Sequence, residues 1–470
     1  MSAAPHVLEA GAERVSLRID EPDAAKEVTA ILTRRGVRVA DGPADGDAVI
    51  ALSTSEPISL ETASTLAESC MEGARRRRPT IILAAWGADQ LATPERAATL
   101  GYLRSFGAII CHDPSTWIET IVLVSRFGLP LGPRLAVVAQ PGSLIAAQAI
   151  ALERESSQRR ATFRGSLDGA DEGHDAVLVD ASTMTGAIPT HVGGARVLPV
   201  VARGELASSA RPELVDLRHA MAAVAAAGDL ALRLDAGLGP GPDQPPESVA
   251  IERERFERQL RNVSTSVGDH ETKVLLSAYG ISVSRQAVAT TPSGAVRIAK
   301  KAGYPVDIKP WGPEVASEAE DCPVERDLLT AADVRRAFGA VATAAGLPSG
   351  APVIVRAAPP EGREVRVSLV DLAEIGWTVV VQTRSRPEPA AAPAPLSRHD
   401  ADALAAAVMA TRADDPEPDL ESLVDLLISA SYLVWEQAES FRAIHMGRIR
   451  LPHDGGAIVV DASAQRRRGS

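Results

Sequence analysis

Two stretches in the C-terminal half of the chain decide the fold: ETKVLLSAYGI at residues 271–281 and GYPVDIK at residues 303–309. The first stretch begins a helix. The second follows a further helix and places Lys309 on a strand. Together they open an α/β unit that continues to the C-terminus.

Upstream of these stretches, residues 14–130 alternate short apolar runs with amphipathic segments, and a second series of the same kind begins at Arg134. This alternation is typical of a parallel sheet covered by helices on both faces. In the first series we expect strands at residues 15–17, 37–39, 48–52, 80–85 and 108–111 and helices at 24–35, 60–75 and 94–106. In the second series we expect strands at residues 135–139, 176–180 and 197–201 and helices at 144–154 and 214–227.

Segments rich in proline and glycine divide the chain. AGLGPGPDQPPE at residues 236–247 is typical of an exposed linker, and RSRPEPAAAPAP at residues 384–395 is a second stretch that we expect to lack regular structure. We therefore expect a first domain at residues 1–130, a second at 131–235, a linker with a lead-in helix at 236–260 and a third domain at 261–470.

The composition limits the classes of function. The chain has 470 residues, a formal net charge of −12, 45% hydrophobic residues and three cysteines. Its length suggests several domains, and its acidity does not favour nucleic-acid binding. Because it has no apolar run of about 20 residues and no secretory leader pattern, we expect a cytoplasmic protein without a membrane span. Three widely spaced cysteines indicate neither a disulfide framework nor a zinc site.

The two deciding stretches resemble the start of the ATP-grasp module of the NDP-forming acyl-CoA synthetases, which are acid–CoA ligases. LPLGPRLAVV at residues 129–138, followed by QPGS at 140–143, resembles the entry to that family's second flavodoxin-like domain. The resemblance implies an α/β multidomain fold, with two flavodoxin-like (succinyl-CoA synthetase-like) parallel-sheet domains followed by an ATP-grasp domain. We expect no counterpart of the N-terminal CoA-binding Rossmann domain that many members have.

The resemblance also implies ligands and site residues in the third domain. The family uses ATP or ADP with Mg²⁺, and CoA. Lys309 and Glu364 match positions that engage a nucleotide, although a structural Lys–Glu link within a retained fold is the alternative. Asp461 matches one of the family's two metal-ligand positions, and one carboxylate alone makes a poor Mg²⁺ site.

A turn in the second domain is the remaining candidate. Gln140, Gly142 and Ser143 belong to a strand–helix turn whose amides lie at a helix N-terminus. Such a turn can hold a phosphate or the CoA pyrophosphate. A plain strand–helix connection is the alternative interpretation.

Several positions depart from the family pattern. The family's phosphohistidine loop, Ser-His-Thr-Gly, corresponds to WGADQLAT at residues 86–93, which has no histidine. The family's His-Lys-x-Asp-x-Gly-Gly segment corresponds to ASEAEDCPV at residues 316–324, which places acidic groups where a triphosphate would approach. The second metal-ligand position, an asparagine in relatives, is Gly447. Because residues 86–93 contain no histidine, we expect the phosphoryl carrier to be missing.

Three other groups of polar residues have plainer interpretations. Asp269 or His270 is expected to cap a helix, rather than to form an acid/base pair with Glu271. DEGHD at residues 171–175 is expected to be a surface loop rather than a metal site. The basic run at residues 75–78 is expected to end a helix, where cations complement the helix dipole.

These observations lead to one hypothesis and one alternative. We expect an acyl-CoA synthetase-like protein that is impaired in the family reaction and acts as a nucleotide- or CoA-binding, regulatory or assembly subunit, with a protein partner or as a homo-oligomer. The alternative is an active, divergent ATP-dependent carboxylate ligase that uses Lys309, Glu364 and Asp461, with Arg448 replacing a lost cation. It would act alone or with a partner chain that supplies the CoA-binding domain.

Overall fold

The computed structural model describes residues 14–40, 48–86, 93–155, 161–164, 166–167, 169–170, 172–183, 188–202, 213–247, 249–263, 266–312, 322–348, 350–383, 388–408 and 419–467. The chain splits into two compact units. Unit 1 comprises residues 1–239 and 411–415, and unit 2 comprises residues 240–410 and 416–470. The hydrophobic core clusters each lie within one unit.

The described part of unit 1 begins with a parallel sheet of strand order β2-β1-β3-β4-β5, the order of flavodoxin-like folds. Side-chain caps fix where its helices begin: Ser59, Thr93 and Asp113 each accept a hydrogen bond from a first-turn amide. The strands are β1 (Arg14–Ile19), β2 (Arg38–Val39), β3 (Ala48–Ser53), β4 (Thr80–Leu83) and β5 (Ile109–Cys111). The helices are α1 (Pro22–Arg34), α2 (Leu60–Arg75), α4 (Pro94–Ser105) and α5 (Pro114–Phe127).

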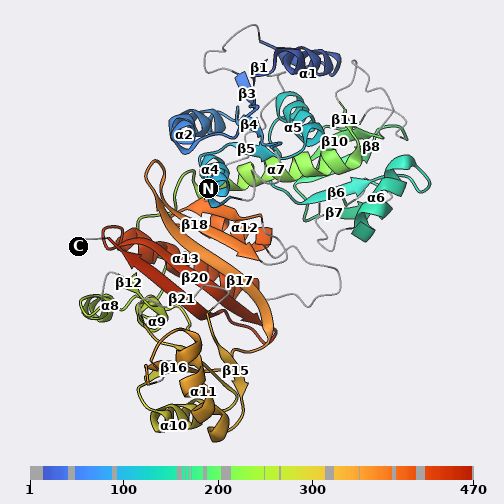
Figure 1. Ribbon diagram of the computed structural model, residues 1–470. Helices are drawn as coiled ribbons and strands as arrows, with labels where there is room; N and C mark the ends of the chain where they lie inside the picture. The colour runs from blue at the N-terminus through green and yellow to red at the C-terminus, as the bar shows by residue number, and fades with distance from the viewer. Residues whose placement is uncertain are drawn as a thin grey trace. The chain divides into compact units, whose positions relative to one another are not determined.

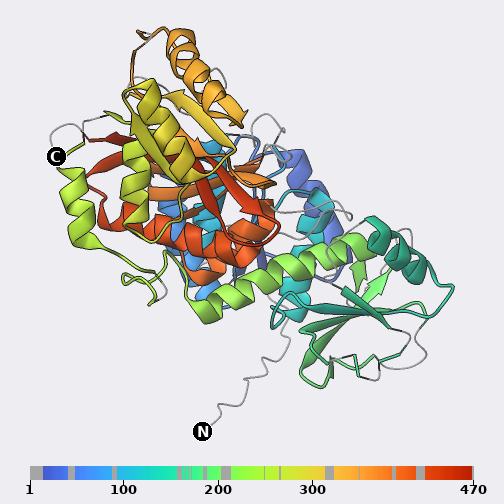
Figure 2. The same cartoon turned by 90° about the horizontal axis from the view of Figure 1, so that it is seen from below.

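A second sheet of unit 1 repeats this topology. Its parallel strands run in the order β7-β6-β8-β10-β11, and β9 adds an antiparallel pairing to β10. The strands are β6 (Leu135–Val138), β7 (Ala161–Arg164), β8 (Ala176–Asp180), β9 (His191–Val192), β10 (Ala195–Val201) and β11 (Leu214–Val215). The helices are α6 (Leu144–Glu155) and α7 (Leu217–Ala236), the long helix that Figures 1 and 2 show in green.

The two sheets of unit 1 share one hydrophobic core. Apolar residues of α5, including Trp117 and Ile121, lie in the same cluster as Leu217 and Val224 of α7 and strand residues of both sheets. The predicted helix at 214–227 was wrong at both ends, since residues 214–215 form β11 and the helix continues to Ala236. Two apolar residues at the start of a segment are compatible with a strand and with a helix until their pairing partner is known.

Unit 2 contains two antiparallel sheets in its described residues, of order β12-β21-β20-β17-β18-β19 and β13-β16-β14-β15. The strands of the larger sheet are β12 (Ser266–Val267), β17 (Gly362–Leu372), β18 (Gly376–Thr383), β19 (Ala390–Pro393), β20 (Phe441–Pro452) and β21 (Ile458–Arg466). Those of the smaller sheet are β13 (Gln286–Ala289), β14 (Val306–Pro310), β15 (Glu325–Leu328) and β16 (Val353–Ala357). The helices are α8 (Arg253–Leu260), α9 (Asp269–Ser277), α10 (Pro292–Ala302), α11 (Ala331–Ala344), α12 (Arg398–Val408) and α13 (Leu420–Glu436).

Each sheet of unit 2 buries one apolar face. Val306 and Ile308 of β14 lie in one core cluster with apolar residues of α10 and α11. Figure 1 shows these two helices beside β16. The larger sheet packs residues such as Val379 against the apolar side of α13. The opposite faces of β14, β16, β20 and β21 carry buried charged residues, which places polar chemistry between the two sheets.

Two expectations about irregular segments were tested. The prediction that residues 384–395 lack regular structure was wrong for Ala390–Pro393, because these residues form β19 and pair with β18. Small alanine side chains fit the core there, and an edge strand tolerates proline. Residues 384–387 lie outside the described residues. The segment at 236–247 has no helix or strand after Ala236, but Tyr432 donates hydrogen bonds to the carbonyls of Pro242 and Gln244.

The predicted α/β multidomain fold is confirmed, with two flavodoxin-like sheets before an antiparallel-sheet region. The exact domain boundaries stay predictions. In the described part of the chain, none of the helices has the length and apolar character that crossing a membrane requires.

Candidate functional site

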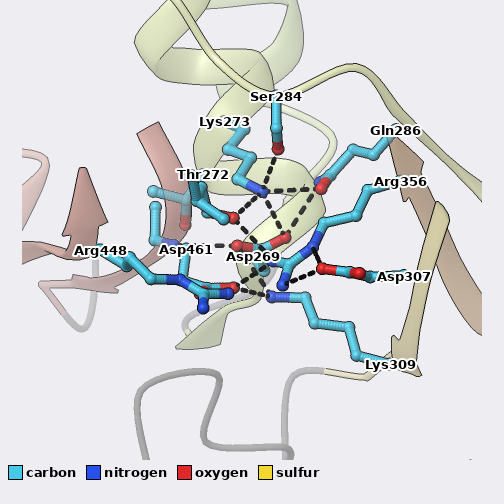
Figure 3. Close-up of polar contacts among 12 residues, drawn as sticks. Asp269, Thr272, Lys273, Ser284, Gln286, Asp307, Lys309, Arg356, Arg448 and Asp461 are labelled. Atoms are coloured by element: carbon cyan, nitrogen blue, oxygen red, sulfur yellow. Dashed lines mark hydrogen bonds and ion pairs between the residues drawn. The ribbon is translucent and has the colours of Figure 1, made fainter. Parts of the chain in front are cut away.

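Seven buried charged side chains lie between the two sheets of unit 2 and form what we call the buried charge network (Figure 3). Its cations and carboxylates come from α9, β14, β16, β20 and β21, so distant parts of the chain build it. The cations are Lys273, Lys309, Arg356 and Arg448, and the carboxylates are Asp269, Asp307 and Asp461.

Asp461 is the centre of the network. Its Oδ1 accepts hydrogen bonds from Lys309 Nζ at 2.7 Å and from Arg356 Nη1 at 2.6 Å. Its Oδ2 lies 2.7 Å from Arg448 Nη2. Both oxygens of this carboxylate are therefore engaged by cations of the protein itself.

Asp269 and Lys273 stand one turn apart on α9, so both side chains face the network. Lys273 Nζ lies 3.0 Å from Asp269 Oδ2 and donates to Ser284 Oγ, to Gln286 Oε1 and to the carbonyl of Val460. Asp269 Oδ1 accepts from the amide of Ala462 and lies 3.1 Å from Lys309 Nζ. The expectation that Asp269 or His270 caps the helix was wrong: Gly268 is the N-cap residue, and Asp269 instead balances two buried lysines.

Arg356 anchors the smaller sheet. It lies opposite Asp307 in the antiparallel register of β14 and β16, and its Nε and Nη2 both donate to Asp307 Oδ2 at 3.1 Å. The Arg356 side chain is fully buried. A planar guanidinium can join two carboxylates in this way, and here it connects Asp307 of one sheet with Asp461 of the other.

The network shifts the protonation equilibria of its members. Burial alone would raise the pKa of Asp461, but Lys309, Arg356 and Arg448 together outweigh burial and hold that pKa far below its usual range. Burial also opposes the charged form of Asp269, and Lys309 and Lys273 again reverse the effect and lower its pKa. For Lys273, burial is the largest influence and lowers its pKa from 10.5 to about 7, despite attraction by Asp269.

A small pocket of about 10 Å³, room for about one water molecule, lies beside the network. This volume is smaller than the roughly 300–1,000 Å³ of ordinary small-molecule sites. The segment at residues 313–321, which holds the acidic substitutions noted in the sequence, lies outside the described residues. The pocket is lined by Asp269, Lys309, Pro310, Trp311, Gly312, Cys322 and Ile354.

The residues around Asp461 do not fit a Mg²⁺ ion. Mg²⁺ takes about six oxygen ligands at roughly 2.0–2.1 Å, whereas Asp461 already contacts three cations that would repel it. Gly447 has no side-chain ligand to offer. Among the described residues, no cluster of three or more His, Cys, Asp or Glu side chains could hold a metal ion.

Glu364, the other predicted nucleotide contact, lies at the edge of the same face. It stands opposite Arg450 in the register of β17 and β20, and its Oε2 lies 3.3 Å from Arg450 Nη2. Among the described residues no ion pair joins Glu364 to Lys309, so the structural Lys–Glu link considered above is not made. Lys309 pairs instead with Asp269 and Asp461.

The predicted turn of unit 1 lies between β6 and α6. The Ser143 amide donates to the carbonyl of Gln140, Ser143 Oγ accepts from the amide of Ala146, and Gly142 has a φ of +88°. Gln140 and Gly142 are exposed. The turn therefore has the geometry of a capped helix start, and its role in binding an anion stays a prediction.

The remaining candidates divide between described and masked positions. In the loop expected to carry the phosphohistidine, residues 87–92 lie outside the described residues. Asp171 does too, while Asp175 of the same cluster pairs with Arg134 at 2.8 Å and His174 contacts the hydroxyl of Thr162. This cluster thus uses its described side chains for structural contacts.

Sequence reasoning missed most of the network. It did not assign Asp269, Lys273, Asp307 or Arg356 to a site. Two signals were present: Asp269 and Lys273 have i,i+4 spacing, and Asp307 alternates with Lys309 on an otherwise apolar strand. Neither signal says which partner the charge meets, because that partner comes from another sheet.

Residues 258–463 match the family described as ATP-grasp domain, and this region of the chain is an ATP-grasp domain. It encloses the whole buried charge network and both sheets of unit 2 except for the last residues of β21, which ends at Arg466.

The chain is homologous to ADP-forming acetate–CoA ligase subunits. It is 23% identical over 223 residues to the beta subunit of the ADP-forming acetate–CoA ligase II of Pyrococcus furiosus, an alignment that covers 44% of this chain and 94% of the relative. It is 25% identical over 203 residues to the ADP-forming acetate–CoA ligase II of Archaeoglobus fulgidus, which covers 41% of this chain and 29% of that relative.

Several solved structures are similar to part of the chain. One is the dinucleotide-forming acetyl-coenzyme A synthetase 1 of Ca. Korarchaeum cryptofilum in complex with coenzyme A, Ca-AMPCP and HgCl⁺. It has a TM-score of 0.42, 24% identity and coverage of 46% of this chain and 100% of that chain. The same protein in its apo form has a TM-score of 0.39 and 23% identity, with the same coverage of both chains.

Proposed function

We propose that this acetate–CoA ligase-like ATP-grasp protein is impaired in the ADP-forming ligase reaction and serves as a nucleotide- or CoA-binding, regulatory or assembly subunit. The observation that carries the proposal is the state of Asp461, whose two oxygens contact Lys309, Arg356 and Arg448. A carboxylate held by three protein cations is a poor ligand for the metal that phosphoryl transfer from a nucleotide requires.

The sequence supports the same conclusion from a second side. Phosphoryl transfer through a carrier histidine needs a free imidazole on an accessible loop. No histidine occurs between His6 and His112, and the loop that would carry it reads WGADQLAT. The ligase reaction of this chain alone would therefore lack both the metal site and the carrier.

A protein partner is part of the proposal. The Pyrococcus furiosus relative is named as a beta subunit, and it aligns over nearly its whole length with this chain. A chain that serves as a subunit would meet a partner, or a second copy of itself, that supplies what the ligase reaction lacks here. Co-purification from the native cell, followed by a ligase assay of the complex, tests this part.

The direct test is an assay of the purified full-length chain with acetate, ATP, Mg²⁺ and CoA. We expect no acetyl-CoA above the rate without protein, while nucleotide or CoA binding is detected by calorimetry. Turnover in the ordinary enzyme range of about 1–10³ s⁻¹ would contradict the proposal. A tryptophan fluorescence spectrum and cooperative thermal unfolding serve as controls that the preparation is folded.

An active, divergent carboxylate ligase is the second candidate. It is favoured by the contact of Lys309, Asp461 and Arg448 at one point, since these would be its cationic and acidic groups. Such an enzyme would release ADP from ATP when given a carboxylic acid and an acceptor. ADP release that depends on the acid and disappears in Lys309→Met would favour this candidate over the first.

A further inference from the structure

Arg448 is placed by an irregularity in β20. Met446 and Ile449 both join the hydrophobic core although a regular strand would put residues three apart on opposite faces. The pairing of β20 with β21 shifts register on both sides of Arg448, which explains this. Bulges of this kind often re-aim a side chain beside a functional site. Here the bulge directs a guanidinium to Asp461 at 2.7 Å.

The Arg448 guanidinium occupies one side of a carboxylate that is already neutralised on the other. Asp461 Oδ1 has Lys309 and Arg356 as partners, so Arg448 at Oδ2 is the third cation on one anion. Below about pH 7, where Lys273 is charged, four cations face three carboxylates and leave the buried charge network with one positive charge in excess. An uncompensated buried charge is costly unless an opposite charge meets it.

Two donor groups on this face lack acceptors. Arg448 Nε and Arg450 Nε are both buried, and neither has a hydrogen-bond partner among the described residues. The two arginines stand two positions apart on β20, so their side chains lie on the same face. Arg450 also donates to the carbonyl of Gly362, which holds its guanidinium in place. Each guanidinium is thus held by partners within the protein and keeps one Nε–H without an acceptor in the described part of the chain, and an anion with several oxygens offers the acceptors that these two donors lack.

The surroundings add further positive charge. Arg326, an exposed residue of the edge strand β15, acts on Arg448 as a like charge, while Glu364 is the carboxylate that faces Arg448 besides Asp461. Arg326 thus adds positive charge beside Arg448. The carboxylate of Glu364 is held 3.3 Å from Arg450, which reduces its repulsion of an anion.

We propose that Arg448 takes the place of the divalent metal at Asp461, and that the face of Arg448 and Arg450 binds the phosphate chain of a nucleotide or of free pyrophosphate without Mg²⁺. This inference rests on the proposed function, because it names how a nucleotide is held when the metal site is lost. The Arg448 guanidinium can bridge a carboxylate and a phosphate without a metal ion, because a guanidinium binds phosphate oxygens through paired N–H donors.

The test is calorimetric titration of the full-length chain with ADP, with pyrophosphate and with adenosine, each in EDTA and in Mg²⁺. We expect ADP or pyrophosphate to bind with the same affinity, within about twofold, in both conditions. Arg448→Ala is expected to weaken that binding about tenfold or more, because charge-assisted hydrogen bonds are lost. Arg448→Lys is expected to weaken it less, since the charge remains. The pyrophosphate titration tells whether the source is a nucleotide or a free polyphosphate.

Arg398→Ala is the matched control. Arg398 is an exposed arginine of unit 2 in surface ion pairs with Asp402 and Glu421, so its removal tests for a general effect of charge. Arg448→Ala should stay folded because Asp461 keeps Lys309 and Arg356, and a thermal transition checks this.

Three outcomes would overturn the inference: binding that requires Mg²⁺, equal binding by Arg448→Ala, or no binding of either phosphate compound. None of these restores ligase activity, so the proposed function would stand. Ordinary ligase turnover would instead defeat the proposed function, whatever the titrations give.

Discussion

Lys273 shows how one residue can carry the pH dependence of a domain. Its Nζ is buried among Asp269, Ser284, Gln286 and the carbonyl of Val460, with Lys309, Arg356 and Asp461 nearby. Burial is the main reason that its pKa falls to about 7 from 10.5. The folded protein therefore releases this proton at a pH where the unfolded chain still holds it.

The sign of the effect on stability follows from that difference. Between about pH 7 and pH 10.5 the unfolded state binds more protons, so the contribution of Lys273 to the free energy of unfolding rises with pH. The slope is about 1.4 kcal/mol per pH unit at most. Below pH 7 the lysine is charged in both states, and its burial penalty is then constant.

The prediction is tested by urea unfolding of the native chain and of Lys273→Met across this pH range. The native chain is expected to gain stability relative to the variant as pH rises from about 7. Met is uncharged and similar in length, so the difference between the two proteins isolates the titration of one group. Parallel curves would show that Lys273 does not titrate in this range.

At the scale of elements, α7 makes an unusually close approach to the entry of β6. A Cβ at Gly228 would lie 2.4 Å from the carbonyl carbon of Gly132 and 2.5 Å from the nitrogen of Pro133. These are backbone atoms, which cannot move aside as a side-chain end can. Gly228 therefore fixes the distance between the helix and the segment that leads into the second sheet.

Gly228→Ala is expected to destabilise unit 1, although alanine is the better helix former by about 1 kcal/mol. Overpacking of this kind costs about 1–3 kcal/mol. Ala222→Gly at an exposed position of the same helix measures the propensity effect by itself. Urea unfolding compares the two variants with the native chain. Stabilisation by Gly228→Ala would mean that the close approach is not made.

At the scale of the whole molecule, the hydrophobic cores divide between the two units. The buried apolar residues within 14–239 and those within 240–467 form separate clusters. Because most folding free energy comes from such burial, each unit has its own source of stability. The units are therefore expected to unfold in two separate transitions.

Calorimetry of variants tests this expectation. Arg356→Met removes the partner of Asp307 and one partner of Asp461, and breaking a buried ion pair costs about 3–5 kcal/mol. It should lower the transition of unit 2 and leave that of unit 1 unchanged, and Gly228→Ala should do the reverse. Arg336→Met, at an exposed ion pair of α11, is the control that should change neither. One joint transition that both variants shift equally would contradict two independent units.

The sequence by itself determined the class of fold and the position of most elements. Helix α2 and strand β8 have the predicted bounds, because apolar periodicity and helix caps are local properties of the chain. Lys309 and Asp461 were also singled out from the sequence, as matches to a family pattern, and the structure places both in the buried charge network. Their surroundings were not predicted, and the acidic substitutions at 316–321 lie outside the described residues.

Only the tertiary structure decided what Asp461 does. The sequence offered it as a weak metal ligand, and the fold brings Lys309, Arg356 and Arg448 onto its two oxygens from three other strands. The partner of a buried charge depends on the register between strands and on a bulge in β20, and neither is encoded in a local pattern of residues. The sequence thus determined which charged residues are present, and the packing of the two sheets decided which of them pair with one another.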